Sequence, residues 1–83
     1  MIDTSNLNKI ARIVIECFKE SDFDEYYINS KIERLEGLNE FQTLFWCSHG
    51  LGEEATVRFA NKINVTVEQL EATFKTIRQI DSK

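Results

Sequence analysis

The spacing of residues 58–74 constrains the fold of this chain more than any other stretch. Apolar side chains recur there every three or four residues in two short runs, which predicts two amphipathic helices. Asn64 lies between the runs and tolerates the left-handed conformation of a tight turn. Thr66 with Gln69 three residues later forms a capping box, which marks the start of the second helix. The expected inner faces are Phe59, Ala60 and Ile63 in the first helix, and Val67, Leu70, Phe74 and Ile77 in the second.

The rest of the chain offers few points where a helix must break. It contains no proline and three glycines, whereas a sheet of this size would need several hairpin turns. Its 83 residues are enough for a hydrophobic core without a metal or a disulfide. We therefore expect an all-α fold: residues 1–83 form a single helical domain, a compact bundle of four or five short helices, with the last two in a helix-turn-helix-like arrangement.

Capping residues and glycines predict where the first three helices begin and end. The first is expected over residues 7–20 with Thr4 or Ser5 as its N-cap. The second is expected to be capped by Ser21 or Asp22, with Asp22 and Glu25 as a capping-box pair, and to stop at Gly37. The third is expected over residues 40–49 after Asn39. Its apolar face is expected to be Phe41, Leu44, Phe45 and Ser48.

The fourth helix is expected to start near Gly52 and to end near Ile63, and the fifth to run from Thr66 into a fraying tail at residues 81–83. The first helix is apolar around more than half of its circumference. Such a helix is buried on most sides, which leaves a central place in the bundle or a homodimer interface as open alternatives.

Residues 56–74 resemble the helix-turn-helix of the tetracycline-repressor type. That family shows an alanine, three residues, Gly-Val-Ser, three residues, Leu-Tyr, two residues and Phe. The matching positions here are Ala60, Asn64-Val65-Thr66, Leu70-Glu71 and Phe74, preceded by Thr56-Val57-Arg58 one residue closer to the alanine than usual. The resemblance covers about a quarter of the chain and implies a dimeric DNA-binding regulator.

The charge of the chain argues against DNA as the partner. Affinity for a duplex comes mainly from lysine and arginine at phosphates, whereas this chain has a net charge of −4. Glu68 and Glu71 also lie in the first turns of the expected recognition helix, where base contacts are made. The side chains left for DNA contact in this alternative are Gln69, Thr73, Lys75 and Arg78.

The excess negative charge lies between residues 16 and 40, interleaved with aromatic residues. Aromatic anchors within an acidic rim suit docking on a basic protein surface, and a nucleic-acid mimic is the extreme form of that idea. The alternative is that the rings are core and the acids form a solvated face. The partner-binding residues predicted by the first interpretation are Asp22, Asp24, Glu25, Tyr26, Tyr27 and Trp46.

The pattern of cysteine and histidine does not indicate catalysis. Cys17 and Cys47 are expected to be reduced thiols, and Cys47 and His49 lie two apart on a helix, so their side chains do not face each other. Two cysteines and one histidine are too few for a structural zinc site, and no phosphate-binding glycine loop is present. We expect no catalytic residue, no metal and no cofactor.

These observations predict a small, cytoplasmic, non-catalytic protein that regulates or inhibits a protein partner with a basic surface. No signal peptide, lipidation pattern or membrane-spanning run is visible in the sequence. Proline-free composition rich in Asn, Ile, Lys and Glu is frequent in phage and mobile-element accessory proteins. The alternative is the dimeric helix-turn-helix regulator described above.

Overall fold

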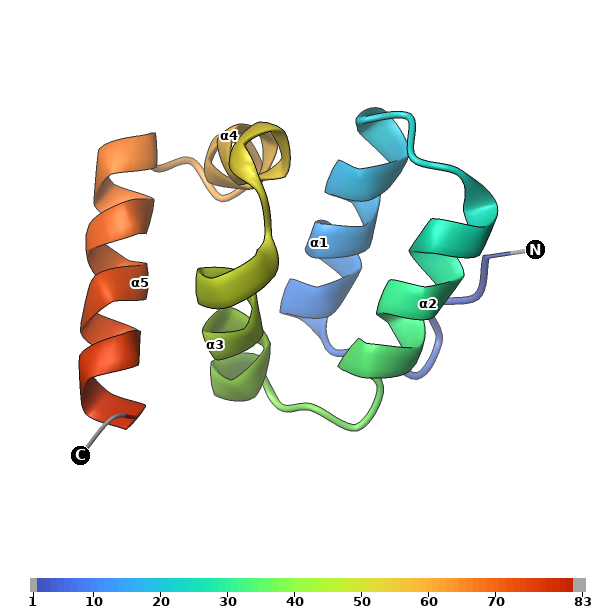
Figure 1. Cartoon of the computed structure of the whole chain (residues 1–83), viewed down its shortest axis with the longest axis horizontal. Helices are drawn as coiled ribbons and strands as arrows, with labels where there is room; N and C mark the ends of the chain where they lie inside the picture. Colours follow the sequence, from blue (N-terminus) through green and yellow to red (C-terminus); the bar gives the residue numbers. More distant parts are fainter. Residues whose placement is uncertain (1, 82–83) are drawn as a thin grey trace.

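A computed structural model describes residues 2–81, which form five helices and no strand (Figure 1). The expected fraying at residues 82–83 lies outside the described part. The all-α fold predicted from the sequence is confirmed. The helices are α1 (Lys9–Glu20), α2 (Glu25–Leu35), α3 (Glu40–Gly50), α4 (Glu53–Lys62) and α5 (Val67–Asp81).

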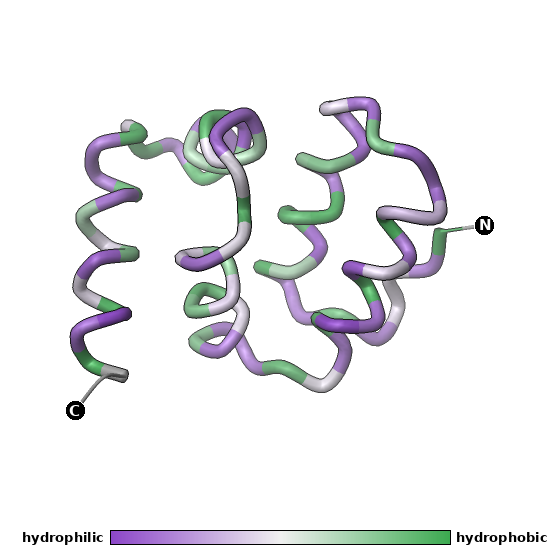
Figure 2. Tube along the Cα trace, viewed as in Figure 1, coloured by the Kyte–Doolittle hydropathy of each residue, from purple (hydrophilic) through white to green (hydrophobic). Residues whose placement is uncertain are grey.

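Helix α1 occupies the centre of the bundle. It packs against α2, α3 and α4, and in Figure 1 it lies between α2 and the column formed by α3 and α4. Figure 2 shows its apolar turns facing that column. Of the two places left open for this helix, the structure shows the central one, since its inner face is fully buried. The buried residues of α1 are Ala11, Val14, Ile15, Cys17 and Phe18.

The N-cap of α1 is Asn8, so the prediction of Thr4 or Ser5 is wrong. The side chain of Asn8 accepts a hydrogen bond from the Ala11 amide at 2.9 Å. Its amide nitrogen also donates to the Leu38 carbonyl and to the Thr43 hydroxyl, both at 2.8 Å. Thr4 instead belongs to a preceding turn, in which its carbonyl accepts from the Leu7 amide.

Helix α3 begins at the predicted Asn39, which forms a capping box with Gln42. The predicted apolar face of α3, Phe41, Leu44, Phe45 and Ser48, is not the face that the bundle buries, because the fully buried residues of α3 are Thr43 and Cys47. Of the predicted face, Leu44 is partly buried against the core. Thr43 is 0% exposed, and its hydroxyl accepts from Asn8 and donates to the Asn39 carbonyl. A satisfied hydroxyl is tolerated in a core, so a polar residue occupies the inward position of this helix.

Helices α4 and α5 are joined by a four-residue connection, one residue longer at each end than the predicted turn between Ile63 and Thr66. Asn64 has a φ of 62°, and Thr66 and Gln69 exchange backbone-to-side-chain hydrogen bonds of 2.9 and 3.0 Å, so the turn and the capping box are confirmed.

In Figure 1, α4 is seen end-on while α5 lies in the plane of the picture, so the two helices cross. Leu70, Phe74 and Ile77 are buried, whereas Val67 is half-buried. Helix α5 packs mainly on α3.

Candidate functional site

Residues 22–26, which we call the acidic tip, form the connection between α1 and α2 and the first residues of α2. All five are exposed. The N-cap of α2 is Asp24, whose carboxylate accepts from the Tyr27 amide at 2.7 Å. The prediction that Ser21 or Asp22 caps this helix is therefore wrong. Asp22 has a φ of 64°, a left-handed conformation that turns the chain before the helix starts.

Two aromatic side chains project from the acidic tip. Tyr26 is 85% exposed, the largest exposed fraction among the large apolar residues of the described chain. Phe23 is 40% exposed, and its ring stacks on Tyr27 with centroids 4.6 Å apart and an interplanar angle of 29°. The tip therefore presents one exposed tyrosine ring in the same short segment as the exposed acidic residues Asp22 and Asp24.

Tyr27 and Trp46 lie around the buried ring of Phe18 instead. Their centroids are 5.9 and 6.5 Å from that of Phe18, in edge-to-face geometry. The ammonium of Lys31 lies 4.9 Å from the Tyr27 centroid and 5.9 Å from that of Trp46, within the range of a cation–π contact. The six predicted partner-binding residues thus fall into two groups. Tyr27 and Trp46 lie beside the Lys31 cation, and Asp22, Asp24, Glu25 and Tyr26 lie on the tip.

A groove runs between α2 and α3, with a cavity volume of about 660 Å³. We call it the aromatic groove. Part of this lining is visible in the sequence, because Phe41 and Phe45 belong to the predicted apolar face of α3 and line this groove. The lining residues are Lys31, Arg34, Leu38, Phe41, Gln42, Phe45, Trp46, His49 and Gly50.

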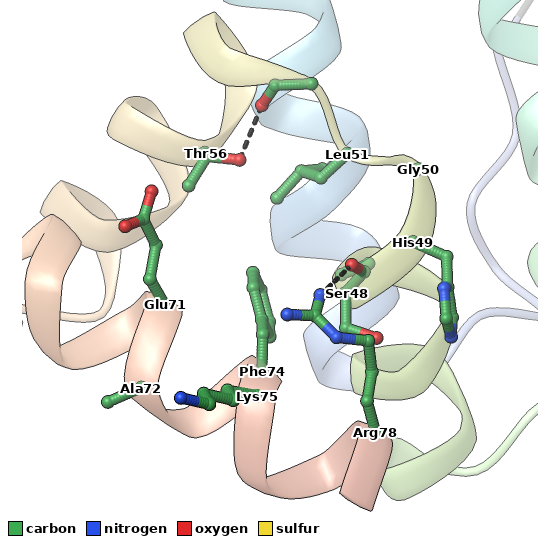
Figure 3. Close-up of a pocket in the computed structure, with 12 residues that line it drawn as sticks. Ser48, His49, Gly50, Leu51, Thr56, Glu71, Ala72, Phe74, Lys75 and Arg78 are labelled. Carbon is green, nitrogen blue, oxygen red and sulfur yellow. Dashed lines mark hydrogen bonds between the residues drawn. The ribbon is translucent and has the colours of Figure 1, made fainter. Parts of the chain in front are cut away.

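The side chains predicted to contact DNA are mostly engaged within the protein. Gln69 is part of the capping box, and the Thr73 hydroxyl donates to the Gln69 carbonyl. Arg78 donates to the Ser48 carbonyl at 2.6 Å, and Figure 3 shows its guanidinium reaching the last turn of α3. Of these four residues, Lys75 is the one whose side chain has no hydrogen bond or ion pair with the described part of the chain.

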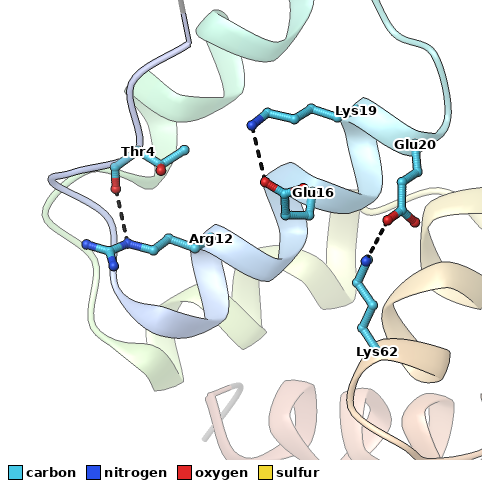
Figure 4. Close-up of polar contacts among 6 residues, drawn as sticks. All are labelled: Thr4, Arg12, Glu16, Lys19, Glu20 and Lys62. Carbon is cyan, nitrogen blue, oxygen red and sulfur yellow. Dashed lines mark hydrogen bonds and ion pairs between the residues drawn. The ribbon is translucent and has the colours of Figure 1, made fainter.

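The cations of α4 are engaged as well. Lys62 forms a 2.6 Å ion pair with Glu20 of α1, as Figure 4 shows, and this hydrogen bond raises the pKa of the Lys62 ammonium. Arg58 lies 3.7 Å from Glu20 and 3.3 Å from Glu54. These pairs join α4 to α1 and leave little positive charge on α4 for phosphates.

A second cavity, of about 490 Å³, lies where α3, α4 and α5 meet (Figure 3). Both Lys75 and Arg78 line it, but so does the carboxylate of Glu71. The mixed charge of these side chains does not favour one class of ligand.

The two cysteines are free thiols, and both are buried. Burial raises the pKa of Cys17 to about 11 and that of Cys47 to about 12, so both are protonated at neutral pH. His49 is exposed, and its ring lies 4.7 Å from that of Phe45. Within residues 2–81, no group of three or more acidic, cysteine or histidine side chains is placed to hold a metal ion.

Comparisons with known proteins give no family for this chain: no family model, curated protein or solved structure matches it. In the described part, no helix is both long and apolar enough to cross a membrane. The helix-turn-helix resemblance of residues 56–74 stays a prediction.

Proposed function

We propose that the protein is a small regulatory or inhibitory factor that binds another protein through the acidic tip. The observation that carries this proposal is the 85% exposure of Tyr26, which directly follows the exposed acidic residues Asp22, Asp24 and Glu25. Tyrosine is among the residues that contribute most to protein interfaces, because its ring supplies a large contact area and its hydroxyl a hydrogen bond. Tyr26 is the anchor in this proposal.

The acidic residues of the tip indicate the charge of the partner's surface. The backbone amide of Asp22 donates to the Lys19 carbonyl, whereas its exposed carboxylate has no hydrogen-bond or ion-pair partner among the described residues, so the charge is available to a ligand. Asp24 faces the amides at the start of α2 while remaining exposed. Negative charge at an interface steers the encounter with a positively charged partner and raises the association rate. The proposed partner is therefore a protein with a basic surface.

The structure dictates how the tip has to be tested. Reversing the charge of Asp24 would also remove the N-cap of α2, which costs about 1 kcal/mol of helix stability. Asparagine is an equally good cap, and it also tolerates the positive φ of Asp22. The variant of choice is therefore Asp22→Asn/Asp24→Asn/Glu25→Gln, which removes the charge and keeps the conformation.

The matched control removes the same charge elsewhere. Glu33, Glu36 and Glu40 are exposed and lie outside the tip, so Glu33→Gln/Glu36→Gln/Glu40→Gln has the same net charge as the tip variant. Tagged wild-type protein, both triple variants and Tyr26→Ala would be compared by quantitative mass spectrometry of proteins captured from a cell extract. We expect a basic partner that the wild type and the control capture and that the tip variant and Tyr26→Ala lose. Equal capture by all four proteins would show that the tip is not the binding surface.

DNA binding is the second candidate, and the observation that favours it is the crossing of α4 and α5 about a tight turn. Fluorescence anisotropy of a labelled duplex at about 50 and about 200 mM salt separates the candidates, because phosphate contacts weaken steeply with salt. Lys75→Ala is the cleaner variant here, since replacing Arg78 also removes its bond to α3. Binding that collapses at high salt and weakens in Lys75→Ala would favour the helix-turn-helix alternative.

A further inference from the structure

Helix α3 carries apolar side chains on two faces, and the bundle covers one of them. Thr43 and Cys47 are buried against the rest of the bundle. Phe41 lies on another side of the helix and remains 45% exposed, with the half-buried ring of Phe45 one turn further along. Two phenylalanines one turn apart at the surface form an apolar stripe that has no covering helix in the described chain.

The stripe forms the floor of the aromatic groove along the length of α3. The lining positions recur at Phe41, Phe45 and His49, which is the four-residue spacing of one helix face. The groove stays open because α2 and α3 both pack on α1, while the two are not among the closely packed helix pairs. Helix α3 has 11 residues and is therefore roughly 16 Å long, which matches two to three turns of a docked helix.

The rim of the groove has the opposite charge to the protein as a whole. Its titratable lining residues are Lys31, Arg34 and His49, and no acidic side chain lines it among the described residues. The net charge of the chain, by contrast, is −4. The ammonium of Lys31 is held over the rings of Tyr27 and Trp46, so the positive charge is fixed directly beside the apolar floor.

We infer that the aromatic groove is a docking site for an acidic amphipathic helix of another protein. The apolar face of such a helix covers Phe41 and Phe45, and its carboxylates meet Lys31 and Arg34. This surface and this partner chemistry are distinct from those of the acidic tip, so the groove can be tested separately.

The same groove suits single-stranded nucleic acid less well, although aromatic rings also stack on bases. A nucleic acid carries a phosphate at every residue, whereas the groove offers two permanent cations. The exposed carboxylates of Glu33 and Glu40 adjoin Arg34 and Phe41 in sequence and would repel a continuous phosphate backbone. An amphipathic helix places its charges beside the cations alone.

The intrinsic fluorescence of the protein can report on binding in the groove. Trp46 is the sole tryptophan and lines the groove, so its emission reports on occupancy. The ligand is a synthetic helical peptide of about 12 residues with leucines at i, i+4 and i+7 and glutamates at the flanking positions. A matched peptide has lysine in place of every glutamate. We expect the acidic peptide to shift the Trp46 emission and to bind at least about tenfold more tightly than the lysine peptide.

Variants of the protein locate the binding. Phe41→Ser should weaken the acidic peptide about tenfold or more, because the side chain is an exposed part of the floor. Arg34→Gln, at an exposed position that is safe for folding, should weaken it severalfold and reduce its salt dependence. Lys75→Gln removes the same charge outside the groove and should bind like the wild type.

Three results would overturn the proposal. The first is equal affinity for the acidic and lysine peptides, or acidic-peptide affinity unchanged in both groove variants. The second is tighter binding of a single-stranded oligonucleotide than of the acidic peptide. The third is a dimer in sedimentation that dissociates in Phe41→Ser without peptide, because the groove would then be occupied by a second copy of the chain.

Discussion

The acidic tip and the α4–α5 pair both lie at a turn between two helices, and both carry polar side chains, but they use these side chains differently. On the tip, Tyr26 is almost fully exposed, and the carboxylate of Asp22 has no partner among the described residues. In the α4–α5 pair, Lys62 and Arg78 bind groups of α1 and α3. A side chain that already has a partner must give it up before it can bind a ligand, so the tip is the more available surface.

The largest effect that tests this comparison concerns stability. Phe74 lies on the buried face of α5, so Phe74→Ala should lower the free energy of unfolding by about 3–5 kcal/mol. Tyr26→Ala should change it by less than about 0.5 kcal/mol, because an exposed ring loses no packing. Urea denaturation followed by circular dichroism measures both. A loss above about 1 kcal/mol in Tyr26→Ala would mean that the tip is part of the structural framework.

The core beneath both regions should respond to alkaline pH. The pKa of Cys47 is raised by burial to about 12, so this thiol binds its proton more tightly in the folded than in the unfolded chain. Its contribution to stability is complete below the unfolded pKa of about 9 and is lost as pH rises toward about 12. Under reducing conditions, stability should therefore fall more steeply between about pH 8.5 and about pH 10.5 in the wild type than in Cys47→Ala. Parallel pH profiles would contradict the assignment of Cys47 as a buried neutral thiol.

A smaller loss of stability is expected when the capping box at the start of α5 is removed. Thr66→Ala and Gln69→Ala should each cost about 1 kcal/mol or less, and the double variant should cost less than the sum, because both bonds belong to one capping box. Strict additivity in a double-mutant cycle would show that the two bonds act independently.

The smallest effect concerns the ion pairs between α1 and α4. Glu20→Gln removes the partner of Lys62 and Arg58, but these side chains remain partly exposed, so the loss of stability should be slight and should vanish at high salt. Glu16→Gln, which removes an exposed pair within α1, is the matched control. A loss larger than that of Thr66→Ala would show that these pairs hold α4 in place.

Local signals were sufficient to predict the helical fold and several helix boundaries. The N-cap at Asn39, the capping box at Thr66 and the left-handed Asn64 depend on residues at most a few positions apart, and all three are present. The caps of the first two helices were missed for two different reasons. Asn8 binds groups 30 and 35 residues away, and Asp22 is displaced from the cap by its own positive φ.

The candidate site was harder to predict, because periodicity reveals an apolar face without revealing what covers it. Phe41 and Phe45 form an apolar stripe on α3, yet the side chains of α3 that the bundle buries fully are Thr43 and Cys47. Trp46 was grouped with the acidic residues because they share one stretch of sequence, whereas in the fold it lies beside Lys31. Only the three-dimensional arrangement separates the acidic tip from the aromatic groove.

The hydrogen bonds of Asn8 have a consequence for the order in which the chain folds. One amide group caps α1 through its oxygen, while its nitrogen holds the Leu38 carbonyl and the Thr43 hydroxyl. The start of the first helix is therefore completed when the segment leading into α3 arrives from 30 residues away. Formation of α1 and α3 is coupled through this side chain, and we expect the first half of the protein to assemble as one cooperative unit.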